Sequence, residues 1–232
     1  MSDRIVVDPR GFAQAAAELI GHQVGGTSRA GGGISLGLAG GNTVAPVYEH
    51  LAALPSVSQS WNAVSFYFGD ERAVPPDHRD SNYRLARETL FSRIPAASER
   101  IHRMEAERDD LDEAAREYDA LLPASLDLLL LGVGADGHVA SLFPGSAALE
   151  ENERRVVPAF GGMPPVARLT ITPRVLAMAK KIIVIVSGAS KQAAVTRALE
   201  GPVDHLACPA QLVRGATWIL DQPAALGLHR GS

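Results

Sequence analysis

The chain has 232 residues with a formal net charge of −4, and its composition is 46% hydrophobic and 21% charged. These values exclude a mainly disordered chain, and because no window concentrates Lys and Arg, nucleic acid and anionic membrane surfaces are not expected as partners. The length is typical of one α/β domain, and no repeat or Pro/Ser-rich linker divides it. We therefore expect a single domain over residues 1–232.

The N-terminal segment and the single cysteine indicate a cytoplasmic protein. Asp8 interrupts the first apolar residues before a signal-peptide core can form. Apolar runs such as 182–186 are far shorter than the ~18 residues of a membrane span. Cys208 has no partner for an internal disulfide, which suits a reducing compartment, and we expect it to be a small buried side chain.

Short apolar runs and helical periods alternate along the chain. The runs predict buried strands at 4–7, 34–39, 63–68, 126–131, 181–186 and 217–220. Helical spacing predicts helices over 12–20, 44–54 and 111–122, and further helices after Ser81 and Lys191, whereas the glycine-rich stretch 25–33 is expected to be a loop. Such alternation requires crossover connections. The predicted fold class is α/β, with a mainly parallel sheet and helices on both faces.

The first candidate site follows the second predicted strand. Gly40, Gly41, Asn42 and Thr43 separate that strand from a helix, so the backbone N–H groups and the helix N-terminus could cradle a phosphate. A glycine turn with an Asn or Thr N-cap is also a routine way to begin any helix. The residues alone leave both interpretations open.

The third predicted strand is followed by Gly69 and an expected loop that begins with Asp70, Glu71 and Arg72. Three adjacent charges at a strand's carboxyl end are costly unless they face solvent, each other or a ligand. A surface ion pair and a ligand contact are therefore both compatible with this segment, and Ser81 is expected to cap the helix that follows it.

A glycine-rich turn follows the fourth predicted strand. Residues 132–137 match the G-x-G-x-x-G pattern of dinucleotide sites, but Pro144 leaves no room for the long helix which that fingerprint requires. Asp136 and His138 lie two residues apart on the turn, and a carboxylate can orient an imidazole to take a proton from water. The alternative is a surface histidine on a turn.

Arg168 and Lys191 are the remaining candidate cations. Arg168 begins a short alternating strand that Thr172 and Pro173 end as helix N-cap and first helical residue, and Lys191 follows the fifth predicted buried strand. Each could be a solvated surface cation or close over a bound phosphate. No G-x-S-x-G, H-E-x-x-H, cysteine cluster or P-loop is present, which disfavours serine-esterase, metal and P-loop chemistry.

Taken together, these segments resemble the 6-phosphogluconolactonase family over nearly the whole chain. Five ordered blocks carry the resemblance: 40–43 with Tyr48 and Glu49, 70–74 with Ser81 and Asn82, 132–145, Arg168-x-Thr170, and Lys191. The block from Asp136-Gly137-His138 to Leu142-Phe143-Pro144-Gly145 is the most specific. The chain departs from the family's Ser-Gly-Gly-Ser-Thr-Pro turn at Ala39, Asn42 and Val44.

The resemblance implies a single Rossmann-like domain that hydrolyses 6-phospho-D-glucono-1,5-lactone to 6-phosphogluconate, without metal or cofactor, in the oxidative pentose phosphate pathway. His138 would be the general base and Asp136 would orient it. Arg72 would stabilise the oxyanion, and Asp70 and Glu71 would contact sugar hydroxyls or fix Arg72. The glycine turn, Arg168 and Lys191 would hold the 6-phosphate.

Two alternatives to a lactonase remain at this stage. The first is a sugar-phosphate isomerase or deaminase of the glucosamine-6-phosphate deaminase type, against which Arg72 counts because an aromatic residue is expected there. The second is a sugar-phosphate sensor of transcriptional regulators, for which the 232 residues leave no DNA-binding module. The expected partner is the small sugar-phosphate lactone. The oligomeric state is left open, and a monomer is compatible with the sequence.

Overall fold

A computed structural model describes residues 3–29, 33–162 and 164–229. Its main sheet has six parallel strands in the order β1-β9-β8-β5-β2-β3. The strands of this sheet are β1 (Asp3–Val7), β2 (Ile34–Leu38), β3 (Val64–Phe68), β5 (Leu128–Leu131), β8 (Ile182–Val186) and β9 (Thr217–Asp221). The predicted α/β class and parallel sheet are confirmed.

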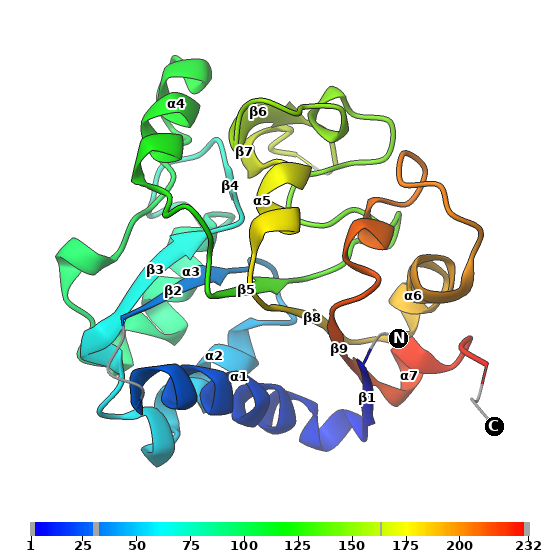
Figure 1. The fold of residues 1–232 in the computed structure, drawn as a ribbon, viewed down its shortest axis with the longest axis horizontal. Helices are drawn as coiled ribbons and strands as arrows, with labels where there is room; N and C mark the ends of the chain where they lie inside the picture. Colours follow the sequence, from blue (N-terminus) through cyan, green and yellow to red (C-terminus); the bar gives the residue numbers. More distant parts are fainter. Residues whose placement is uncertain (1–2, 30–32, 163, 230–232) are drawn as a thin grey trace.

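Helices cover the sheet, as expected for right-handed crossovers between parallel strands. In Figure 1, α1 and α2 lie on one side of the sheet and α4 and α5 on the other. The helices are α1 (Phe12–Arg29), α2 (Ala45–Ala53), α3 (Asn82–Thr89), α4 (Leu111–Leu121), α5 (Pro173–Met178), α6 (Gln192–Glu200) and α7 (Gln222–Ala225). Their apolar faces and the β-branched strands form one hydrophobic cluster, which includes Cys208 at 1% exposure.

The expected loop over 25–33 is wrong for its first part, because α1 continues through Gly25 and Gly26 to Arg29. Glycine in a helix costs about 1 kcal/mol, but here small residues permit close packing. A Cβ on Gly21 would lie 2.8 Å from a Leu54 methyl group, and one on Gly25 would lie 3.5 Å from the Ser56 carbonyl oxygen. Residues 30–32 of the expected loop lie outside the described residues.

A second, antiparallel sheet of three strands was not predicted, although its middle strand was predicted to begin at Arg168. It consists of β4 (Asp70–Arg72), β7 (Ala167–Ile171) and β6 (Val156–Phe160), with β7 in the middle. The charged segment that the sequence placed in a loop is therefore a strand, and Arg72 pairs directly with Arg168 across the ladder. Because of this pairing, Arg168 of β7 lies beside β4, the strand that contains Asp70, although 98 residues separate Asp70 and Arg168 in the chain.

Strand order explains where the loops meet. From β2 the chain proceeds outward to β3, whereas β5 lies on the other side of β2 and the chain then continues outward through β8 and β9. Ligands of open α/β sheets bind outside the carboxyl ends of the strands at such a reversal. The segments after β8, β5, β2 and β3 thus lie in that order along one edge.

Candidate active site

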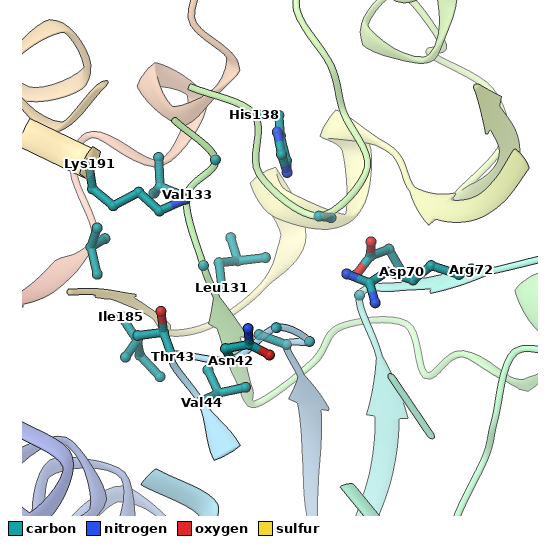
Figure 2. Close-up of a pocket in the computed structure, with 18 of the residues that line it drawn as sticks. Asn42, Thr43, Val44, Asp70, Arg72, Leu131, Val133, His138, Ile185 and Lys191 are labelled. Atoms are coloured by element: carbon teal, nitrogen blue, oxygen red, sulfur yellow. The ribbon is translucent and has the colours of Figure 1, made fainter. Parts of the chain in front are cut away.

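A cavity of about 350 Å³ opens at this carboxyl edge. All predicted site residues except Asp136 line it: Gly40, Gly41, Asn42, Thr43, Asp70, Arg72, His138, Arg168 and Lys191. Figure 2 shows His138 above the cavity, Lys191 on one side of it, Asp70 and Arg72 on the other, and Asn42 and Thr43 below. The topology therefore gathers residues from five separate segments around one space.

Asp136 lies directly behind His138. The His138 ring nitrogen Nδ1 is 2.6 Å from Asp136 Oδ1, and the His138 backbone N–H donates to the same oxygen at 3.1 Å. Because a carboxylate only accepts hydrogen bonds, Nδ1 carries a proton, and in the neutral form of the ring the lone pair is then on Nε2. Burial tends to raise the pKa of Asp136, but the hydrogen bonds from His138 outweigh it and lower that pKa to about 2. Asp136 is accordingly an anion at any pH near neutrality.

The turn that carries this pair is closed by backbone hydrogen bonds. Gly137 N–H donates to the Gly134 carbonyl at 3.0 Å, and Gly134 N–H donates to the His138 carbonyl at 2.9 Å. Gly137 has a φ of +95°, which favours glycine. The Phe143 ring packs 4.7 Å from the His138 ring between centroids, so the imidazole is confined on that side as well.

Gly134→Ala is expected to displace the His138 ring and so to lower the kcat of a reaction that uses this ring roughly a hundredfold. A Cβ on Gly134 would overlap the His138 ring and lie 2.5 Å from Asp136 Oδ1. Steady-state kinetics and the melting temperature Tm would be measured beside Gly26→Ala, since a Cβ at that exposed position meets nothing within 4 Å. Wild-type kcat in Gly134→Ala would contradict the observed placement of the ring.

The glycine turn has no side-chain cap, unlike the routine helix start that the sequence left open. The N-cap of α2 is Val44, which makes no side-chain hydrogen bond. Gly41 has a φ of +96°, and a Cβ on Gly40 would overlap the Asn82 amide group. Both glycines are thus required by geometry, and the turn presents its backbone to the cavity.

Tyr48 fixes the start of the glycine turn from inside the protein. Its hydroxyl donates to the Ala39 carbonyl at 2.7 Å and accepts from the Ala39 N–H at 3.0 Å. The side chain is fully buried, and burial raises its pKa, so it stays a neutral phenol. Neighbouring Glu49 instead pairs with Arg93 at 2.8 Å on the surface. Only the first residue of the Tyr48-Glu49 pair therefore supports the turn.

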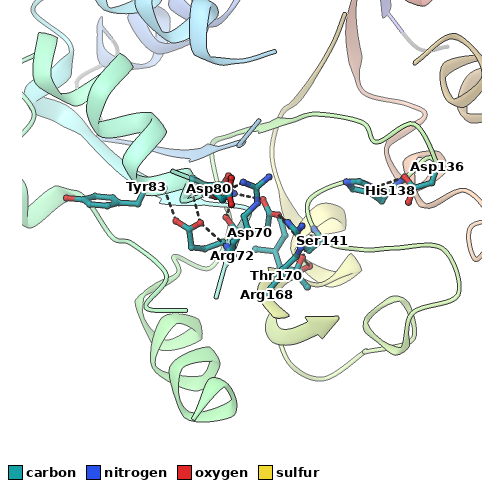
Figure 3. A network of polar contacts seen from close by, with 12 residues as sticks. Asp70, Arg72, Asp80, Tyr83, Asp136, His138, Ser141, Arg168 and Thr170 are labelled. Carbon is teal, nitrogen blue, oxygen red and sulfur yellow. Dashed lines mark hydrogen bonds and ion pairs between the residues drawn. The ribbon is translucent and has the colours of Figure 1, made fainter. Parts of the chain in front are cut away.

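Asp70 is buried at the side of the cavity and is held by three side chains, of which Figure 3 labels Ser141 and Arg168. The Ser141 hydroxyl donates to its Oδ2 at 2.6 Å and the Asn82 amide donates to its Oδ1 at 3.0 Å. Arg168 Nη1 lies 3.9 Å from Oδ2. Asp70 thus connects β4, α3 and the turn after His138.

Glu71 points away from the cavity into the start of α3. Its carboxylate accepts from the backbone N–H groups of Arg72, Asn82 and Tyr83 at 2.7–2.8 Å, and from the Ser81 hydroxyl at 3.1 Å. Burial raises the pKa of Glu71, and the backbone hydrogen bonds oppose this shift. Ser81 also caps α3, as predicted, by accepting from the Arg84 N–H. Glu71 is a structural link between β4 and α3.

Arg72 and Arg168 bring two guanidinium groups to the same rim of the cavity. Arg72 donates to the Asp80 carbonyl at 2.6 Å, and within the described residues its buried Nε has no hydrogen-bond partner. The Arg168 guanidinium stacks 5.5 Å from the Phe143 ring centroid. Burial lowers the pKa of Arg168, the Asp70 charge opposes that shift, and the Arg72 charge adds to it. Two adjacent cations and one carboxylate leave this rim able to bind an anion.

Lys191 reaches the cavity from the other side, where a 3₁₀ turn over Ala189–Lys191 leads into α6. Its ammonium has no hydrogen-bond or ion-pair partner in the part of the chain that the structure describes. Burial lowers its pKa, and the Asp136 charge opposes that shift. A half-buried cation of this kind gains from a bound anion.

Two further observations complete the site. Arg197 of α6, which no sequence motif singles out, donates to the Asp136 carbonyl. Thr172 occupies the predicted N-cap position of α5, but its hydroxyl donates to the Arg154 carbonyl and does not cap the helix.

Among residues 3–29, 33–162 and 164–229, no three His, Cys, Asp or Glu side chains are grouped to hold a metal ion.

Comparison with known proteins decides the family. Residues 7–220 match the family model described as glucosamine-6-phosphate isomerases/6-phosphogluconolactonase. The chain belongs to this family. The resemblance that the sequence motifs suggested is confirmed. Every predicted site residue lies within the matched range. No described helix is long and apolar enough to cross a bilayer.

Curated relatives of this family member are named 6-phosphogluconolactonase. The human protein is 37% identical over 206 residues, covering 82% of this chain and 79% of its own length. The Synechocystis protein is 35% identical over 210 residues, covering 84% of this chain and 85% of its own. The Mycobacterium tuberculosis protein is 34% identical over 232 residues, covering 93% of each chain.

Solved structures agree with the fold of this family. The 6-phosphogluconolactonase from Trypanosoma cruzi has a TM-score of 0.86 at 27% identity, covering 99% of this chain and 98% of its own. A monomeric glucosamine-6-phosphate deaminase gives the same TM-score of 0.86 at 23% identity, covering 97% of this chain and 100% of its own. The fold is therefore common to both activities, and the fold alone does not separate them.

Proposed function

We propose that this chain hydrolyses 6-phospho-D-glucono-1,5-lactone to 6-phospho-D-gluconate, a step of the oxidative pentose phosphate pathway in the cytoplasm. The observation that carries the proposal is the Asp136–His138 pair, 2.6 Å apart, in contact with a cavity that also contains Lys191, Arg72 and Arg168. This reaction requires a general base that activates water and cationic groups that bind the phosphate. The curated lactonase relatives, at 32–37% identity, support the same assignment.

The reaction begins with a water molecule between His138 and the lactone carbonyl carbon. His138 Nε2 takes a proton from the water as its oxygen attacks that carbon, and a tetrahedral oxyanion forms. When the intermediate collapses, the bond between the carbonyl carbon and the ring oxygen breaks, and the imidazolium returns the proton to the ring oxygen. The product acid then loses its proton to solvent. Asp136, ionised throughout, stabilises the imidazolium and keeps its ring oriented.

The remaining cavity groups would bind the 6-phosphate and stabilise the oxyanion. The backbone of the Gly40–Thr43 turn, including Asn42, would hold the 6-phosphate with Lys191 on one side and Arg168 on the other. Arg72 would stabilise the oxyanion, and Asp70, fixed by Ser141 and Asn82, would keep Arg168 in place. A phosphate anchored away from the reacting carbon spends its binding energy on orientation.

Two assays run side by side test the proposal. The lactone is generated in situ and its hydrolysis is measured against the spontaneous rate, while ammonia release is measured with glucosamine 6-phosphate. We expect acceleration in the first assay and none in the second. Ammonia release without lactone hydrolysis would show that the chain is a deaminase, which its curated relatives do not favour.

Chelation is expected to leave lactone hydrolysis unchanged, because the proposed chemistry needs only the imidazole, cations and backbone groups. The measurement is kcat before and after prolonged incubation with EDTA, followed by gel filtration. A loss of activity that added divalent metal restores would contradict this part of the proposal.

A further inference from the structure

Two hydrogen bonds from outside the turn hold the backbone on either side of Gly137. Arg197 Nη2 donates to the Asp136 carbonyl, and the Ala210 N–H donates to the Gly137 carbonyl at 2.8 Å. Gly137 itself fits closely, since a Cβ there would lie 2.8 Å from Arg197 Nη2 and 3.0 Å from Cys208 Sγ. The turn is thus fixed by α6 and by the segment that follows it.

Arg197 is distinct from the other arginines at this site. It does not line the cavity, so it has no direct contact with a ligand there. A second arginine on the same region, Arg214, provides a comparison: its Nε donates to the Ala198 carbonyl at 2.6 Å and its Nη2 to the Gly201 carbonyl at 2.7 Å. Arg214 therefore binds the carboxyl end of α6, a structural role, whereas Arg197 binds the peptide that carries the proposed base.

The direction of the His138 ring depends on the backbone of this turn. Both the backbone N–H and Nδ1 of His138 bind the same oxygen of Asp136, so a rotation of the Asp136–Gly137 peptide moves carboxylate and imidazole relative to each other. Gly137, with a φ of +95°, offers little resistance of its own because glycine permits many backbone conformations. Inside the turn, the bond from the Gly137 N–H to the Gly134 carbonyl opposes this rotation, and Arg197 adds a second bond to the same peptide from outside.

We infer that Arg197 is a positioning residue for the Asp136–His138 pair: by holding the Asp136 carbonyl it keeps His138 Nε2 aimed at the cavity. This inference rests on the proposed function, since His138 acts there as the base. Displacing a reacting group by about 1 Å can cost on the order of a hundredfold in rate. Substrate binding should be nearly unaffected, because Arg197 does not line the cavity.

The test compares Arg197→Met and Arg197→Lys with Arg214→Met. Arg197→Met is expected to lower kcat about ten- to a hundredfold with KM changed less than about threefold. Arg197→Lys, which keeps one donor, should recover part of the loss. Arg214→Met should lower Tm but keep kcat. Wild-type kcat in Arg197→Met, or a loss expressed in KM alone, would overturn the inference.

A double-mutant cycle with Asp136→Asn shows whether Arg197 acts through the pair. If it does, Arg197→Met should lower kcat less than about threefold further in the Asp136→Asn background, because the pair is already disrupted. Fully additive losses would mean that Arg197 acts independently and would overturn the inference.

A measurement that does not depend on enzymatic activity, the NMR spectrum of the His138 ring, separates this inference from the proposed function. The ring-proton NMR signals of His138, assigned by their absence in His138→Ala, should shift in Arg197→Met and not in Arg214→Met. Shifted signals in a chain without lactonase activity would refute the proposed function and leave the positioning role intact. Unshifted signals would overturn the positioning role even in an active enzyme.

Discussion

His138→Ala is expected to lower kcat of lactone hydrolysis by about 10²–10⁴, equivalent to roughly 3–5 kcal/mol of activation free energy. The reason is that, among the described residues that line the cavity, His138 alone is an imidazole, and its Nδ1 lies 2.6 Å from a carboxylate oxygen. The product should still bind, because the cationic groups that would hold its phosphate are intact. Steady-state kinetics with lactone generated in situ and calorimetry with 6-phosphogluconate measure the two effects.

His50→Ala is the matched control, since His50 is exposed near the end of α2. It should keep wild-type kinetics. Turnover near the wild-type rate in His138→Ala would rule out the general-base role. Loss of 6-phosphogluconate binding in the same variant would instead mean that His138 holds the ligand, and the mechanism would need a different base.

Lys191→Met is expected to lower kcat/KM for the phosphorylated lactone by about 10–100-fold and to have little effect on unphosphorylated gluconolactone. A hydrogen bond to a charged group is worth about 1.5–3 kcal/mol, and Lys191 has no competing partner among the described side chains. Lys180→Met serves as the control, because Lys180 forms an exposed ion pair with Asp127 and such pairs contribute little. Equal losses on both substrates would refute a phosphate contact.

The charge of Lys191 also predicts a pH dependence. Burial lowers the pKa of Lys191, so this ammonium loses its proton at a lower pH than an exposed lysine does. Affinity for 6-phosphogluconate should therefore fall as the pH rises through that pKa, and the fall should be absent in Lys191→Met. Calorimetry across the alkaline range measures it. An identical decline in the variant would assign the titration to another group.

The parallel sheet could be predicted from sequence because its inner strands are buried on both faces and appear as continuous apolar runs such as Leu128–Leu131. The edge strand β1, predicted to be buried, is largely exposed. The second sheet could not be predicted from sequence. Its strand β4 is the charged triplet Asp70–Arg72, and β6 contains Pro158, so neither has the apolar alternation that identifies a strand. Long-range pairing with β7 makes them strands, and pairing is invisible to a local pattern.

The candidate site divides in the same way. Glycine turns and the Asp136-Gly137-His138 segment are local motifs, so the glycine turn and the polar side chains that line the cavity could be predicted from sequence. The contacts that fix them come from distant segments: Tyr48 on Ala39, Ser141 on Asp70, and Arg197 on Asp136. Glu71 shows most clearly what a local motif misses. It is adjacent to Asp70, which suggested a shared role, but neighbouring side chains of a strand point to opposite faces, and the Glu71 carboxylate binds the start of α3.

The most direct test of the account is the ratio of kcat/KM for 6-phosphogluconolactone to that for unphosphorylated gluconolactone, measured with the purified wild-type protein. One cavity that combines a base with a phosphate cradle predicts hydrolysis well above the spontaneous rate and a ratio of about 10² or more. A ratio near one, or no acceleration of either lactone, would contradict the central claim.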